Sequence, residues 1–179
     1  MKKINFILLL SVMIIFLIVI VNIFRSNDDI TISMYNGNKV SGITYNIDNL
    51  ENGIYKADFF VKEYKHGEFV EEYNLYSSNI EHKSRNVSLK VGVEDSIENH
   101  YIKAFVKDSF SKELKLNFLE NNSVINFLII EKAKVISLDE EIPIVVYNNS
   151  EENVGISSGY DIGQYEDEVI IYLKLSKVS

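Results

Sequence analysis

Residues 54–64 read IYKADFFVKEY, and this stretch decides the fold class of the chain. Apolar and charged residues alternate along it. Successive side chains of a β-strand point to opposite faces of the sheet, so the alternation predicts a strand with one buried face and one solvated face. The buried face would carry Tyr55, Ala57, Phe59 and Val61, and the solvated face would carry Lys56, Asp58 and Lys62.

The residues that follow predict a hairpin. His66-Gly67 is a tight-turn signal, and Phe69–Tyr76 is expected to return as the partner strand. The charges in KEYKHGEFVEEY are typical of the outward face of a soluble sheet edge. The next segment, Ser77–Asn86, is polar and is interpreted as a loop or a weak strand.

The period of two recurs along most of the chain, with turn signals about every 8–12 residues. Further strands are predicted at Ile30–Met34, Val40–Ile47, Val87–Val93, Tyr101–Lys107, Phe110–Leu119, Val124–Ile130, Ala133–Leu138, Ile142–Tyr147 and Val169–Leu175. Turns or loops are expected at Asn36–Asn38, Asp48–Gly53, Glu94–Asn99, Asn121–Ser123 and Asn148–Gly163. The pattern predicts an all-β fold, a single antiparallel β-sandwich that is loosely Ig-like.

Some of these segments carry finer predictions. Inward positions are expected at Val87, Leu89, Val91, Val93, Leu114, Leu116 and Phe118. Val124–Ile130 is apolar on both faces; a short buried helix is the alternative, but its Val and Ile content favours a central strand. Ala133–Leu138 would continue it after a bend. Pro143 has no N–H to donate and is expected at a strand start or an edge.

Near the N-terminus, Ile4–Phe24 reads INFILLLSVMIIFLIVIVNIF and carries no charge. A transmembrane helix needs about 20 apolar residues to cross about 30 Å of hydrocarbon, and it satisfies its own backbone polar groups. The stretch is apolar on every side, whereas a buried helix of a soluble domain would have an amphipathic stripe. It is therefore predicted to be one N-terminal transmembrane helix.

The flanking charges predict the orientation of this helix. Lys2 and Lys3 precede it, and only Arg25 follows closely, so the N-terminus is expected in the cytoplasm and the remainder outside. A cleaved secretory signal is the alternative and would export the same residues. Because Val21–Ser26 contains nothing like an A-x-A cleavage site, an uncleaved signal-anchor is favoured. A lipoprotein is excluded because the chain has no cysteine.

These predictions divide the chain into a membrane anchor (residues 1–25), a linker (26–29) and one extracytoplasmic domain (30–179). Absence of cysteine excludes a disulfide framework, a thiolate metal site and a cysteine nucleophile. An exported chain without cysteine indicates a bacterial envelope that does not depend on disulfides, and a Gram-positive envelope is the natural interpretation.

Charge is distributed unevenly between these parts. The chain has 18 Lys and Arg and 26 Asp and Glu. Three of the basic residues precede residue 26 and every acidic residue follows it, which leaves 15 basic against 26 acidic side chains, or −11, in residues 26–179. Such a surface repels nucleic acid, so nucleic-acid binding is not expected.

One sequence pattern suggests a catalytic nucleophile. Gly155–Gly159 reads GISSG and matches Gly-x-Ser-x-Gly. A nucleophile elbow needs an apolar strand before the pattern, a helix after it and a histidine later in the chain. Here the surrounding residues are polar or acidic and no histidine lies beyond residue 100, so a hydrolase is not favoured.

Other chemistry-bearing residues do not form a recognisable motif. His66, His82 and His100 lie in predicted turns or loops without zinc-ligand spacing, and surface histidines are expected. Carboxylates gather at Asp139–Glu141, Glu151–Glu152 and Glu166–Glu168, but calcium-loop spacing is absent. No pair of acids is singled out as that of a glycosidase. No catalytic, cofactor-binding or metal-ligating residue is therefore predicted, and no cofactor.

Two further patterns concern the surface. Exposed tyrosines near strand ends or loops would suit a carbohydrate, although tyrosine is common in strands and the chain has no Trp. They are Tyr64, Tyr73, Tyr76, Tyr147, Tyr160 and Tyr165. Three Asn-x-Ser patterns begin at Asn86, Asn121 and Asn148 and are interpreted as chance matches in an Asn-rich chain.

Two stretches resemble a known group of proteins. LENGIYKADFFVKEYKHGEFVEEYNLYS (Leu50–Ser77) and EEIPIVVYNNSEENVGISS (Glu140–Ser158) are similar to small exported proteins of Gram-positive bacteria, a family without an assigned function. Those proteins have a lipoprotein signal or membrane anchor and one β-rich domain. The resemblance covers about a third of the chain and implies localisation and fold. It transfers no functional residue, and without a lipobox cysteine this chain would be an anchor-type member.

The sequence thus predicts a single-pass membrane protein whose extracytoplasmic domain binds an unknown ligand and does not catalyse a reaction. An accessory subunit docked on another envelope membrane protein is the second hypothesis, and an envelope hydrolase is the third. The expected partners are the membrane and a protein of the envelope.

Overall fold

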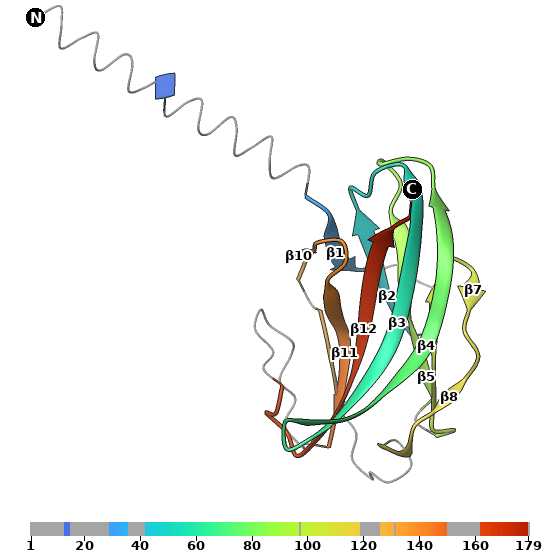
Figure 1. The fold of residues 1–179 in the computed structure, drawn as a ribbon, viewed down its shortest axis with the longest axis vertical. Helices are drawn as coiled ribbons and strands as arrows, with labels where there is room; N and C mark the ends of the chain where they lie inside the picture. Colours follow the sequence, from blue (N-terminus) through green and yellow to red (C-terminus); the bar gives the residue numbers. More distant parts are fainter. Residues whose placement is uncertain are drawn as a thin grey trace, which may run out of the picture.

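The computed structural model describes residues 13–14, 29–35, 42–96, 98–118, 126–130, 132–149 and 162–178. The described part is all-β, in two antiparallel sheets (Figure 1). The seven-stranded sheet has the order β10-β1-β2-β5-β6-β7 with β8 also beside β6, and the five-stranded sheet has the order β4-β3-β12-β11-β9. The strands are β1 (Thr31–Met34), β2 (Ile43–Asp48), β3 (Gly53–Lys65), β4 (Glu68–His82), β5 (Leu89–Ser96), β6 (Tyr101–Val106), β7 (Ser109–Phe110), β8 (Leu114–Lys115), β9 (Asn126–Ile129), β10 (Lys134–Val135), β11 (Glu141–Asn148) and β12 (Asp167–Lys177).

Strand β3 confirms the prediction made from the alternating stretch. Its predicted buried residues, from Tyr55 to Val61, are at most 1% exposed. Lys56 is exposed, while Asp58 and Lys62 on the other face are partly exposed. Hydrogen bonds to β4 on one side and β12 on the other make β3 an interior strand of its sheet.

The predicted hairpin is also confirmed. Lys65 pairs with Glu68, so His66 and Gly67 form a two-residue turn with φ angles of 50° and 80°. Two positive φ angles match the right-handed twist of the strands, and glycine adopts such an angle without steric cost. Strand β4 then continues to His82, so the weak-strand interpretation of the polar segment holds for its first six residues.

Both sheets contribute to one hydrophobic core, which gives a sandwich-like arrangement. Two buried tyrosines link the sheets across it. The Tyr45 hydroxyl on β2 donates to the Ile144 carbonyl on β11, and the Tyr147 hydroxyl on β11 donates to the Asp95 carboxylate on β5 at 2.7 Å. Burial raises the pKa of both phenols, so each stays a neutral donor. These bonds join the layers of a chain that has no disulfide.

The order of the strands differs from the Ig arrangement. In an Ig domain the strand beside B comes after its outer neighbour in the chain, and the strand beside C comes before its outer neighbour. Here β5, beside β2, precedes β6, and β12, beside β3, follows β11. The β5–β6 pair beside β2 and the β11–β12 pair beside β3 therefore each have the reverse order of the corresponding Ig strands. The Ig-like part of the prediction is not matched.

Strand β12 and the second half of β11 are buried on both faces. Strand β12 lies between β3 and β11, and the run from Val169 to Leu173 is at most 7% exposed. Val124–Ile130 was expected in such a place, but β9 lies at the end of the five-stranded sheet. The next strand along the chain, β10, does not continue β9, because β10 pairs with β1 in the other sheet.

The reason for this error lies in where the chain crosses between the sheets. Ile130 and Ile136, on either side of that crossing, are 5% and 6% exposed and belong to the common core. The Ile130 N–H donates to the Tyr45 hydroxyl of the opposite sheet at 3.3 Å. Ile130 and Ile136 therefore close one side of the sandwich. Apolar residues near this crossing do not indicate that the strand lies in the centre of a sheet.

Phe110–Leu119 is not one strand. Two short strands, β7 and β8, each pair antiparallel with β6, but the strand pairing is interrupted between them. The Ser111 hydroxyl accepts the Ala104 N–H at 3.0 Å, so a side chain takes the place of a backbone acceptor in the ladder. The inward positions Leu116 and Phe118 are nevertheless buried, as predicted.

Three other predictions are tested at strand ends. Val87 was expected inward but is 59% exposed, because β5 begins only at Leu89. Strand β5 also runs to Ser96, into the segment expected to turn. Pro143 lies where β11 pairs only with β12, beside a register shift, and its missing N–H is tolerated there as predicted.

Several predicted segments lie outside the described residues. They are Ile4–Phe24 apart from Met13 and Ile14, the turns Asn36–Asn38 and Asn121–Ser123, and residues 150–161 of the polar loop. Within the residues that are described, no helix has the length and apolar character needed to span a membrane.

Candidate functional site

The turn of the β3–β4 hairpin lies at the end of the sandwich away from the point where residue 29 enters it (Figure 1). Strand β3 runs between the two ends: Tyr55 pairs with Lys177 near one, and Lys65 pairs with Asp167 at the other. At about 3.3 Å per residue, its 13 residues span about 40 Å. The far end is therefore well separated from the entry end.

The segment of residues 162–166 packs against the hairpin turn. The His66 N–H donates to the Glu166 carbonyl at 2.7 Å. A Cβ on Gly67 would lie only 3.1 Å from the Cα of Gly163, and both glycines have positive φ angles. The two backbones thus approach each other as only glycines allow.

Glu168 fixes the other side of the same segment. Its side chain is 1% exposed, and its carboxylate accepts the N–H groups of Gly163 and Tyr165, both at 2.9 Å. A buried carboxylate needs such donors to offset its desolvation. These bonds hold residues 162–166 in place against the hairpin turn.

Five aromatic side chains extend toward this end on the outer face of the five-stranded sheet, and we call them the far-end aromatic patch. They are Phe60, Tyr64, Phe69, Tyr165 and Tyr172. Phe60 and Tyr172 stack with ring centroids 5.4 Å apart, and Tyr64 meets Phe69 edge-on at 6.1 Å. Phe60, Tyr64 and Tyr165 are partly buried and Tyr172 is 7% exposed, whereas Phe69 is 58% exposed and is the ring most open to a partner.

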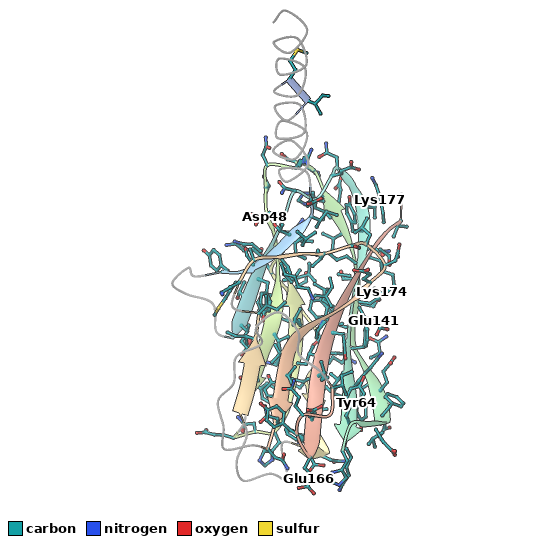
Figure 2. The ribbon with its side chains drawn as sticks, turned by 90° about the vertical axis from the view of Figure 1, so that its left-hand side faces the viewer. Asp48, Tyr64, Glu141, Glu166, Lys174 and Lys177 are labelled. Atoms are coloured by element: carbon teal, nitrogen blue, oxygen red, sulfur yellow. The ribbon has the colours of Figure 1, made fainter. Side chains whose placement is uncertain are left out.

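A lysine reinforces the inner part of the patch. The Lys62 ammonium lies 5.2 Å from the Phe60 ring centroid and 5.1 Å from that of Tyr172, and it binds the Glu141 carboxylate at 2.7 Å. Burial and a hydrogen bond with Tyr64 raise the pKa of Tyr172. Figure 2 shows Lys174, Glu141 and Tyr64 in succession along this side of the molecule.

An acidic cavity of about 300 Å³ opens beside the patch, and Glu63, Glu168 and Phe118 are among its lining residues. Glu63 faces Glu71 across the β3–β4 pair, and one Glu63 carboxylate oxygen is buried with no hydrogen-bond partner in the described part of the chain. Burial and the Glu71 charge raise the pKa of Glu63. The Tyr73 hydroxyl donates to Glu71 at 2.7 Å, which raises the pKa of Tyr73 to about 12.

The three histidines occupy different environments and do not converge. His66 is in an exposed turn, 3.9 Å from the Glu166 carboxylate, and His100 is in the turn before β6. His82 is not a surface loop residue as predicted: it ends β4 and is 4% exposed. In the described part of the chain no three His, Asp or Glu side chains gather in a way that would hold a metal ion.

The predicted tyrosines separate into two groups. Tyr64 and Tyr165 belong to the far-end aromatic patch, whereas Tyr147 is a core residue and Tyr73 and Tyr76 pack, partly buried, against the core. The Gly155–Gly159 pattern, the Glu151–Glu152 cluster and Tyr160 lie outside the described residues. Sequence reasoning missed Phe60, Phe69 and Tyr172, although their strand positions place them on the outward face of the sheet.

No protein-family model, curated protein or solved structure gives a significant match to this chain.

Proposed function

We propose that the chain is a single-pass envelope protein whose extracytoplasmic β-domain binds a partner and does not catalyse a reaction. Residues 1–25 would be the membrane anchor with a cytoplasmic N-terminus, 26–29 the linker and 30–179 the exported domain. The uncharged stretch Ile4–Phe24, the lysines before it and the acidic domain after it support this topology.

The far-end aromatic patch is the observation that carries the binding role. A short linker would hold the entry end of the domain close to the membrane. The hairpin end would then stand about 40 Å farther out, where an exposed aromatic surface can meet another molecule. Aromatic side chains supply much of the binding energy in protein interfaces, so a protein of the envelope is the proposed partner.

An accessory subunit of another envelope membrane protein is the second candidate. The hydrogen bonds of Glu168 and the close contact of Gly67 with Gly163 favour a lasting contact, because they would hold this surface in one shape before a partner binds. In either case the same side chains would make the contact.

The test compares two exposed phenylalanines. Phe69→Ser removes a ring that is 58% exposed within the patch, and Phe110→Ser removes one that is 51% exposed on the other sheet. The full-length chain is purified from detergent-solubilised envelopes of the producing cells. We expect one protein to co-purify with the wild type and with Phe110→Ser, and to be lost with Phe69→Ser. Partner-free purification of the wild type, or equal loss with both variants, would count against the proposal.

A further inference from the structure

A second cavity, of about 440 Å³, lies between the end of β4 and the β6–β7 turn. Its size is within the range of small-molecule sites. Six polar residues of its lining matter here, and we call this cavity the side groove. They are Ser78, Asn79, His82, Lys83, Lys107 and Ser109.

His82 is the most unusual member of the groove. It is 4% exposed, and its Nε2 atom has no hydrogen-bond partner among the described residues. Its ring meets Tyr55 edge-on at 6.5 Å, so the core holds it in place. Buried polar atoms are nearly always hydrogen-bonded, and an exception requires an explanation. A polar ring is thus kept beside a polar cavity at a cost in stability.

Lys107 is held in an unfavourable backbone conformation at the opposite wall. Val106 pairs with Ser109, so Lys107 is the first residue of a two-residue turn, and its φ is 54°. Glycine is the usual residue where a tight turn needs a positive φ, and other residues are strained there. The lysine ammonium reaches across the groove to the Glu81 carbonyl at 3.1 Å.

The charge of Lys107 remains available to a ligand. Lys83 has Glu81 as an ion-pair partner at 3.2 Å, whereas no carboxylate of the described residues lies within ion-pair distance of the Lys107 ammonium. The hydroxyl of Ser78 makes a long hydrogen bond, 3.4 Å, to the Asn79 carbonyl. Ser88, also in the lining, is already bound to Asp48.

We infer that the side groove is a binding site for a small hydroxylated anion, a phosphate or carboxylate that also carries hydroxyl groups. The Lys107 ammonium would bind the anionic group, and the serine hydroxyls and the Asn79 amide would bind the ligand hydroxyls. His82 forms part of the groove wall, so its ring reports on the occupancy of the groove. This site is separate from the far-end aromatic patch and does not depend on the partner proposed for it.

The test uses the full-length chain in detergent, with glucose 6-phosphate and gluconate as probes and uncharged glucose as the comparison. Isothermal titration calorimetry measures affinity. We expect saturable binding of at least one anion, and binding about tenfold or more weaker in Lys107→Gly, since a hydrogen bond to a charged group is lost. The same substitution should raise the melting temperature, because glycine adopts a positive φ without the backbone strain that a lysine has there.

His100→Gly is the matched control. His100 also has a positive φ, 56°, but lies at the other end of β6. It should raise the melting temperature and leave the affinity unchanged. In NMR spectra of the wild type, the His82 ring signal should move on addition of the anion while that of His66 stays in place. Absence of saturable binding for both anions, or equal affinity in Lys107→Gly, would overturn the inference.

Discussion

The hydrogen bond from Tyr147 to Asp95 should be a major link between the two sheets, and Tyr147→Phe removes it with little change in shape. The phenol is completely buried, and its hydroxyl lies 2.7 Å from the Asp95 carboxylate. A hydrogen bond to a charged group contributes about 1.5–3 kcal/mol. For a domain of this size we expect the melting temperature to fall by roughly 5–10 °C.

A second tyrosine on the surface supplies the control. Tyr73 donates to Glu71 at the same distance, 2.7 Å, but in an exposed position. Because water can replace this bond, Tyr73→Phe should change the free energy of unfolding by no more than about 0.5 kcal/mol. Thermal and urea unfolding of both variants, followed by circular dichroism, measures the difference. Equal losses for the two variants would refute the argument that burial makes the cross-sheet bond strong.

Two further substitutions test the packing and the charges. Gly92→Ala should destabilise the fold by about 1–3 kcal/mol or more, because the new Cβ would lie 2.2 Å from the Ile43 carbonyl oxygen and 2.5 Å from the Phe105 ring; unchanged urea unfolding would contradict this. Glu63→Gln should stabilise the fold at pH 7, since it removes a carboxylate that is partly buried and faces Glu71. The pKa of Glu63 is higher in the folded than in the unfolded chain. Its contribution to folding stability is therefore present below the unfolded-state pKa and is lost as the pH rises through the folded-state pKa. The advantage of the glutamine variant should therefore shrink as the pH falls toward 4, and a difference that stays constant from pH 7 to pH 4 would disprove it.

Alternating patterns were the part of the sequence that predicted the fold well. In β3 and in the first half of β5, the side chains expected inward are buried. Period two reports which face is buried, and this property is local to each strand. Strand order depends on contacts between distant residues, which explains why the central position predicted for Val124–Ile130 and its continuation in Ala133–Leu138 were wrong.

The candidate sites were harder to predict for a similar reason. His82 seemed to lie in a loop because the polar residues before it hide the continuation of β4, which pairs with β3 as far as Gly53. Lys107 was predicted as the last residue of a strand, because lysine is not a residue that marks a positive φ in a turn. The far-end aromatic patch requires β12 to lie beside β3, a pairing of residues more than a hundred positions apart.

The membrane topology is the central claim, and absence of cysteine makes it directly measurable. A single cysteine is introduced at Glu68, which is exposed beside the hairpin turn, or at Lys2 as the cytoplasmic control. Intact cells are treated with a membrane-impermeant maleimide. We predict that Glu68→Cys is labelled in intact cells and that Lys2→Cys is labelled only after the membrane is permeabilised. Labelling of Glu68→Cys only after permeabilisation would contradict an extracytoplasmic binding domain.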